Sequence, residues 1–122
     1  MTIWPFSLFG KPRKMSIRKI DERFATAGQI RPVDVKALAD EGYVAIVCAR
    51  PDNEEPGQPA FAEIAAEAGK HGLKAIHIPV SGPPTQDQIA QFDEAMSSLD
   101  GSVLGYCRSG ARSAALYSSL GR

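Results

Sequence analysis

Cysteine and histidine are scarce in this chain of 122 residues, which contains two of each. Two cysteines, Cys48 and Cys107, are too few for a disulfide framework, so we expect a reducing setting and a cytoplasmic location. The two histidines have no cysteine pair at the spacing of a zinc site. We therefore expect neither a structural metal nor a cofactor.

The chain also lacks an excess of either charge and a long apolar run. Lys and Arg together number 14, as do Asp and Glu, so bulk charge gives no reason to expect nucleic acid as a partner. Residues 1–14 are apolar, but Pro5 and Ser7 interrupt them, and the stretch is too short to span a membrane. Its basic residues follow the apolar ones, the reverse of a signal peptide.

Length and composition predict one domain. We expect residues 1–14 to be a disordered tail, or Met15 to be the true start, and residues 15–122 to form the folded domain. A weak interfacial anchor within residues 1–14 is the alternative, although we expect no membrane partner.

Strands and helices are expected to alternate after residue 31. Pro32 suits the first turn of a helix, and Gly42 marks its end. The apolar run 43–48 is typical of a strand buried on both faces of a parallel sheet. The other expected elements are a loop at 50–59, a helix over 60–70, a strand within 73–80, a helix beginning at Thr85, and two short strands or an extended lead-in within 16–31. This order predicts an α/β fold, a three-layer sandwich around a mostly parallel central sheet.

The stretch 101–120 places a cysteine between a strand and a helix. Residues 103–106 form an apolar run of strand length, and helical spacing follows Arg112. A helix start leaves backbone N–H groups unpaired and carries the positive end of the helix dipole, so a cysteine that faces it ionises more easily. We predict that Cys107 is a thiolate nucleophile and that Arg112 binds an anionic substrate. The alternative is a buried, unreactive cysteine followed by a surface arginine.

The remaining loop residues are candidates for anion binding. Ser109, Gly110, Ala111 and Ser113 are expected to contribute backbone amides, and Gly110 allows the backbone to turn those amides inward. Arg108 either lines the mouth of the site or faces solvent.

Accessory candidates lie in and near the loop 50–59. Arg50 and Asp52 either position the substrate or only stabilise a turn. Cys48 is expected to be a packed core thiol, with a protective disulfide to Cys107 as the alternative. His77 is expected to be structural and His71 to lie at a helix end or in a loop.

The chain resembles the beta-lactamase hydrolase-like protein phosphatase-like (DUF442) family over nearly its whole length after residue 14. The residues that carry the resemblance are Arg18 to Phe24, Ala27 to Ile30, Arg50 to Asp52, Glu55 to Gln58, His77 to Val80 and Tyr106 to Gly110. The loop from Cys107 to Ser113 is similar to the active loop of cysteine-based phosphatases and of rhodanese-type sulfurtransferases. The resemblance implies a fold similar to that of dual-specificity phosphatases. It also implies association with metallo-β-lactamase-like, persulfide-handling hydrolases.

Two features separate the reactions that such a loop supports. Four residues lie between Cys107 and Arg112, whereas cysteine-based phosphatases characteristically have five, so the anion site is expected to be smaller. Phosphate ester cleavage also needs a proton donor for the leaving group, and the segment 80–85 has no carboxylate. Asp87 falls inside the next helix, which leaves Asp52 as the other candidate acid.

We therefore expect a cysteine-dependent sulfurtransferase that moves sulfane sulfur through a Cys107 persulfide to a thiol acceptor. Its expected partners are a small sulfur-containing anion or persulfide and that thiol. The alternative is a cysteine-based phosphatase that hydrolyses phosphoproteins or small phosphate esters through a phosphocysteine intermediate. A third interpretation is a non-catalytic module that binds a persulfide or an anion for a partner enzyme.

Overall fold

The computed structural model describes residues 15–121, and its core is a five-stranded sheet with strand order β1-β2-β5-β3-β4. The short strand β1 runs antiparallel to β2, and all other neighbouring pairs are parallel. The strands are β1 (Ile17–Lys19), β2 (Phe24–Ala27), β3 (Tyr43–Cys48), β4 (Lys74–His77) and β5 (Ser102–Tyr106). The predictions of a mostly parallel sheet and of two short strands within 16–31 are confirmed. The expected tail at 1–14 lies outside the described residues.

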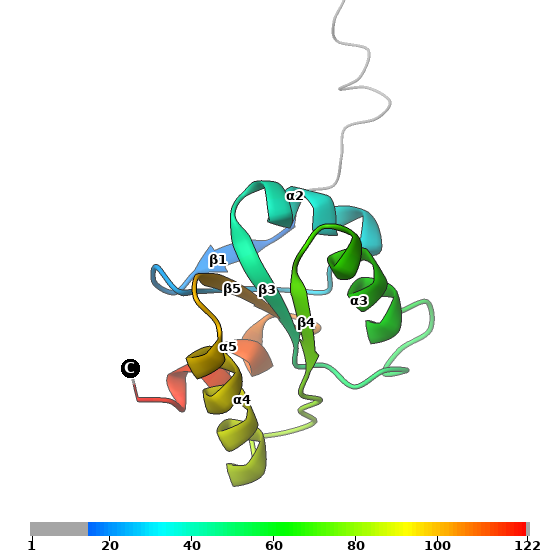
Figure 1. The fold of residues 1–122 in the computed structure, drawn as a ribbon. Helices are drawn as coiled ribbons and strands as arrows, with labels where there is room; N and C mark the ends of the chain where they lie inside the picture. The colour runs from blue at the N-terminus through cyan, green and yellow to red at the C-terminus, as the bar shows by residue number, and fades with distance from the viewer. Residues whose placement is uncertain (1–14, 122) are drawn as a thin grey trace, which may run out of the picture.

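Helices cover both faces of this sheet (Figure 1). The helical elements are η1 (Pro32–Asp34), α2 (Val35–Asp40), α3 (Phe61–Lys70), α4 (Gln86–Ser98) and α5 (Ala111–Ser118). Helices α2 and α3 share one apolar core with the sheet, and α4 and α5 share the other. The predicted three-layer sandwich is therefore confirmed.

One element differs from its expected form. The helix expected from Pro32 begins as a single 3₁₀ turn, in which the Asp34 amide donates to the Arg31 carbonyl at 2.9 Å, before α2 starts. Strand β4 lies within the predicted stretch 73–80, and beyond its end the Ile78 and Val80 amides still donate to the Cys48 and Ala49 carbonyls at 2.9 and 3.1 Å.

Alternation along the strands divides the apolar side chains between the two cores. Ile46 and Leu104 face α2 and α3, while their neighbours Val47 and Val103 face α4 and α5. Each of these four side chains is fully buried, as a sheet covered on both faces requires.

Close packing brings the start of α5 onto the sheet. A Cβ atom at Gly105 would lie 2.5 Å from the Phe24 ring and 2.9 Å from the Cβ of Ser113, so only glycine fits between them. Phe24 stacks on Tyr117 of α5 with ring centroids 4.5 Å apart and meets Phe92 of α4 edge-on at 5.6 Å. These contacts fix α5, and with it the loop that precedes it.

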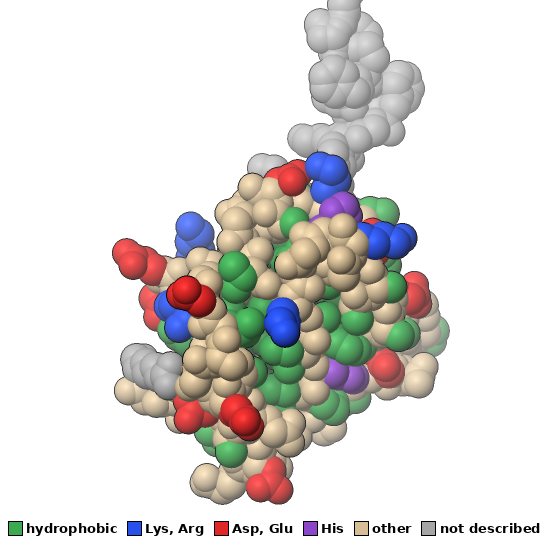
Figure 2. All heavy atoms as spheres, in the orientation of Figure 1, with side chains coloured by type: hydrophobic (Ala, Val, Ile, Leu, Met, Phe, Trp, Pro, Cys, Tyr) green, Lys and Arg blue, Asp and Glu red, His purple; other side chains and the backbone are tan. Residues whose placement is uncertain are grey.

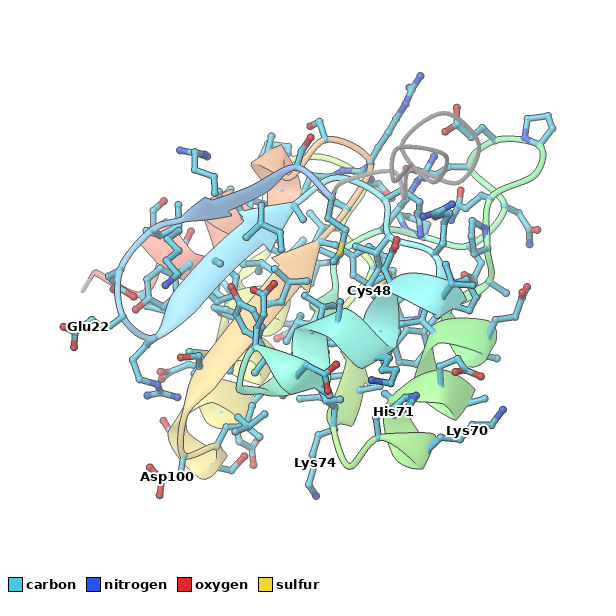
Figure 3. The ribbon with its side chains drawn as sticks, turned by 90° about the horizontal axis from the view of Figure 1, so that it is seen from above. Glu22, Cys48, Lys70, His71, Lys74 and Asp100 are labelled. Carbon is cyan, nitrogen blue, oxygen red and sulfur yellow. The ribbon has the colours of Figure 1, made fainter. Side chains whose placement is uncertain are left out.

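The four parallel strands end at one edge of the sheet. The Ala49 amide donates to the Tyr106 carbonyl at 2.8 Å, and the Cys107 amide donates to the Ala27 carbonyl at 3.2 Å, so the chain stays aligned beyond the strand ends. Figure 3 labels Cys48 near this edge, with Lys74 and Asp100 at the opposite end of the sheet. The edge where open α/β sheets bind ligands is therefore the edge that carries Cys107.

The surface drawn in Figure 2 carries Lys and Arg side chains interspersed with Asp and Glu side chains. Within residues 15–121, no helix has both the length and the apolar character needed to cross a membrane.

Candidate active site

The loop between β5 and α5 wraps around the sulfur of Cys107. Gly110 is the N-cap of α5 and has a left-handed backbone with φ of 98°, which favours glycine. In this conformation the Gly110 amide donates to the Cys107 Sγ at 3.0 Å. The Cys107 side chain is fully buried.

Backbone amides favour the thiolate form of Cys107. Burial raises the pKa of the thiol, but the amides of Ser113, Ser109, Arg112 and Gly110 point toward the sulfur and together lower the pKa below its ordinary value. Ala111 is the first residue of α5, and its amide donates to the Ser109 Oγ at 3.3 Å. The four amides that surround the sulfur form an anion nest, a name we keep for the amides of residues 109, 110, 112 and 113.

Residues of strand β2 and of the segment just after it support the loop that carries Cys107. The Thr26 hydroxyl donates to the Gly110 carbonyl at 2.7 Å and contacts the Ser113 hydroxyl, which donates to the same carbonyl at 3.1 Å. A Cβ atom at Gly28 would lie 3.0 Å from the Arg108 carbonyl oxygen. Thr26 and Gly28 are thus supporting residues that the sequence did not identify, because nothing in it indicates that β2 pairs with β5.

Arg112 is held against the loop by a carboxylate. Its two terminal nitrogens bind the two oxygens of Glu54 at 2.7 and 2.9 Å, and Nη1 also donates to the Val80 carbonyl at 2.7 Å. Only 21% of the side chain is exposed. Glu54, and to a lesser extent the nearby Cys107 thiolate, raise the pKa of Arg112, so the guanidinium stays charged beside the nest.

Arg50 binds the two glutamates of the loop 50–59, next to the nucleophile loop. Its side chain is 1% exposed, and its three nitrogens donate to Glu54 at 2.8 Å, Gln29 at 2.9 Å and Glu55 at 2.9 Å. Burial lowers the pKa of Arg50, but the two glutamates more than offset this and raise it overall. Arg50 therefore acts through other residues, as the anchor for two carboxylates.

Glu54 and Glu55 connect Arg50 to the two arginines of the nucleophile loop. Glu54 binds both Arg50 and Arg112, which lower its pKa to about 2. Glu55 binds Arg50 and lies 3.5 Å from the Arg108 guanidinium. Sequence reasoning missed both glutamates. The available signal was the arginine near them in a loop at the ligand-binding edge, since a buried arginine needs carboxylate partners.

The other sequence candidates have structural contacts. The Asp52 carboxylate accepts a hydrogen bond from the Phe61 amide at 2.8 Å, which caps the start of α3. His77 bonds to the Arg50 carbonyl at 2.8 Å and stacks on Phe61, so its predicted structural role is confirmed. His71 is the C-cap of α3, as expected of a helix end.

Cys48 is a core thiol, as predicted. It packs in the core formed with α2 and α3, whereas Cys107 packs in the core formed with α4 and α5. Burial raises the pKa of Cys48, and its thiol donates to the Arg50 carbonyl at 3.3 Å. Both cysteines are free, so the alternative of a disulfide between them is not realised.

Carboxylates near the nucleophile are engaged by arginines. The segment 80–85, whose Val80 carbonyl accepts a hydrogen bond from Arg112, contains no carboxylate. Asp87 lies in the first turn of α4. Glu54 contacts the nucleophile loop directly, but its pKa of about 2 makes it a poor proton donor at neutral pH. The arrangement suits attack on an anionic group whose leaving atom departs without protonation.

The family model described as "Beta-lactamase hydrolase-like protein, phosphatase-like domain" matches residues 16–121. Proteins named beta-lactamase hydrolase-like protein from Agrobacterium fabrum and Xylella fastidiosa are each 39% identical over 104 residues, which make up 84% of this chain and 24% of each relative. The chain thus spans about a quarter of the length of these curated relatives.

Solved structures of similar fold are named for phosphatases. A candidate phosphatase from Neisseria meningitidis is 34% identical, with a TM-score of 0.76 over 85% of this chain and 75% of that one. A DUF442 candidate phosphatase from Shewanella putrefaciens is 17% identical, with a TM-score of 0.74 over 97% of this chain and 73% of that one. The active form of Tk-PTP is 24% identical, with a TM-score of 0.61 over 88% and 76%. The last two show likeness of fold alone.

Proposed function

The chain belongs to the family of beta-lactamase hydrolase-like protein phosphatase-like domains, and from this premise we propose that it is a cysteine-dependent phosphatase that acts on small phosphate esters or phosphoproteins. The observation that carries this proposal is the convergence of four backbone amides on the Cys107 sulfur, beside the guanidinium of Arg112. That arrangement supplies an ionised nucleophile and an anion site at the same point.

The proposed reaction has two steps. The Cys107 thiolate attacks phosphorus, an S–P bond forms, and the P–O bond to the leaving group breaks with its electron pair going to that oxygen. The oxygen of water then attacks phosphorus, the S–P bond breaks with its electron pair returning to sulfur, and the phosphate leaves with the protons of the water. The nest amides and Arg112 stabilise the negative charge on the phosphoryl oxygens during both steps. Because Glu54 and Glu55 are bound by arginines and Asp52 caps α3, we expect aryl and other acidic leaving groups to react best.

Sulfur transfer, which the sequence led us to expect, is the second candidate. The known relatives favour phosphate instead, since both the family and the 34% identical structure are named for phosphatases. Two observations still favour sulfur transfer over phosphate hydrolysis. Four residues separate Cys107 from Arg112, and the segment 80–85 offers no acid. In this reaction the thiolate attacks the outer sulfur of thiosulfate, sulfite leaves with the S–S electron pair, and an acceptor thiolate then takes the outer sulfur of the persulfide. In this second candidate reaction, the acceptor thiol belongs to a metallo-β-lactamase-like, persulfide-handling enzyme.

One comparison of substrates tests the proposal. The protein and its Cys107→Ser variant are incubated with p-nitrophenyl phosphate, and separately with thiosulfate and an acceptor thiol. We expect phosphate release by the unmodified protein and none by the variant. Sulfite release without phosphate release would replace the proposal by the second candidate. Anion binding without turnover of either compound would instead indicate the binding module considered above.

A further inference from the structure

A cleft of about 540 Å³ lies beside the nucleophile loop. It runs between the segment that follows β2, with Gly28 and Arg31, and the loop that carries Glu55 and Gln58. Arg50 and Arg108 also line it. A cleft of this volume is large enough for a small organic molecule and much larger than an inorganic anion needs.

Arg108 presents a cation to this cleft, and its guanidinium has no hydrogen-bond partner among the residues that the structure describes. Its side chain is 68% exposed, and its guanidinium lies 3.5 Å from the Glu55 carboxylate, a long ionic contact. The nearer attachment of Glu55 is to the buried Arg50, at 2.9 Å. Glu55 therefore neutralises part of the charge of Arg108 without occupying its hydrogen-bonding edge.

Arg31 presents a second cation that also lines the cleft. Asp34 accepts from its Nη2 at 3.1 Å and from its Nε at 3.4 Å, while Nη1 has no partner within residues 15–121. The side chain is 38% exposed. Asp34 thus orients the guanidinium and leaves one amino group available.

The cleft adjoins the nucleophile loop at Arg108, although Cys107 and the nest residues do not line it. Arg108 directly follows Cys107, and its carbonyl lies against Gly28, which lines the cleft. A substrate that used both sites would extend from the nest past Arg108 into the cleft.

We propose that this cleft is a subsite for a carboxylate on the non-reacting part of the substrate, bound by Arg31 and Arg108. The inference rests on group transfer at Cys107, as proposed above, and adds the class of substrate. A planar carboxylate matches the donor edges that the two guanidinium groups leave open. A single negative charge suits the site, because Glu55 and Asp34 already neutralise part of the arginine charge and would repel a more highly charged group.

Binding measurements on a Cys107→Ser protein test this subsite without turnover. The probes are 3-carboxyphenyl phosphate and 3-carbamoylphenyl phosphate, which differ in charge but hardly in shape, and their affinities are measured by calorimetry. We expect the carboxylate to bind about fivefold more tightly, as partly exposed ion pairs allow. Adding Arg31→Gln or Arg108→Gln should remove this preference, with the affinity of the carbamoyl compound falling less. Lys74→Gln, at the opposite end of the sheet (Figure 3), is the matched control and should preserve it.

Glu55→Gln should increase the preference for the carboxylate compound, and misfolding of the variant would not produce such an increase. The amide keeps an acceptor for Arg50 but removes the charge near Arg108, so the preference for the carboxylate should increase. Equal affinities of the two phosphates, or a preference that persists in both arginine variants, would overturn the subsite.

The sulfur analogues separate the subsite from the proposed function. If only the corresponding carboxyphenyl and carbamoylphenyl thiosulfonates bind, and the carboxylate is again preferred, the subsite is supported and phosphate hydrolysis is not. If the phosphates are hydrolysed by the unmodified protein with no preference in binding or in kcat/KM, the subsite is wrong and the phosphatase stands. Failure of all four compounds to bind would overturn both.

Discussion

Glu54→Gln is the most informative single change, because Glu54 joins the buried Arg50 to Arg112 beside the nucleophile. Glutamine keeps one oxygen acceptor and nearly the same volume but removes the charge that both arginines share. We expect the Arg112 guanidinium to lose its fixed position. Stability and reactivity should therefore fall together, with Glu54 acting as a positioning residue.

The magnitude follows from the pKa of Glu54. A decrease from an ordinary value near 4.5 to about 2 corresponds to roughly 3 kcal/mol of preference for the charged carboxylate in the folded protein. Since 28% of the side chain is exposed, solvent screening reduces this to about 1.5 kcal/mol of stability at pH 7. Because the folded pKa lies below the unfolded one, this stability is complete above about pH 4.5 and is lost as the pH falls toward 2.

Urea unfolding at pH 7 and at pH 3 measures this difference between the unmodified protein and Glu54→Gln. We expect about 1.5 kcal/mol at pH 7 and a smaller gap at pH 3. In parallel, kcat/KM toward an aryl phosphate should fall by at least about tenfold, as loss of a positioned cation does. Glu55→Gln, which does not contact Arg112, is the control and should retain more activity. Unchanged kcat/KM in Glu54→Gln would refute the role of Glu54 in holding Arg112.

Further predictions concern the nucleophile and its support. The rate of Cys107 alkylation by iodoacetamide should rise with pH and reach half its maximum below about pH 8.5, because the nest amides lower the pKa of this thiol. Cys48 in the native protein should stay unreactive, because burial raises its pKa. Equal reactivity of the two cysteines would contradict this prediction. Gly110→Ala should lower the free energy of unfolding by about 1–2 kcal/mol, because alanine is strained at φ of 98°. It should also raise the pH midpoint of Cys107 alkylation, because the Gly110 amide donates to the sulfur. An unshifted midpoint would show that the nest amides do not lower the pKa of Cys107. Arg50→Met should lower the free energy of unfolding by about 3 kcal/mol in urea, because Glu54 and Glu55 lose their shared buried partner; a loss below about 1 kcal/mol would mean that the anchor is dispensable.

Much of the fold could be predicted because local signals were strong. The Thr85 hydroxyl accepts from the Gln88 amide at 3.1 Å, and the Gln88 side chain accepts from the Thr85 amide at 3.0 Å, so the capping box begins α4 as its residues indicate. The apolar run 43–48 became the buried strand β3. Each of these features depends on residues that are close in sequence.

The parts of the site that sequence reasoning missed depend on contacts between distant residues. Glu54 meets Arg112 across 58 positions, and Thr26 meets Gly110 across 84. Composition made the loop 50–59 recognisable, but it could not say which carboxylate turns toward the nucleophile loop. Asp52 and Glu54 are two positions apart, yet one caps α3 and the other binds Arg112. The strand pairings and the burial of Arg50 decide between them.

Trapping the reaction intermediate tests the central claim, that the transferred group is carried on Cys107. The protein is mixed with excess p-nitrophenyl phosphate, stopped in alkaline detergent within the first turnover, and digested for mass spectrometry. We predict a phosphoryl group on the peptide that contains Cys107, and neither adduct nor turnover in Cys107→Ser. Turnover that continues in Cys107→Ser, or a phosphoryl group found on another residue, would contradict the account.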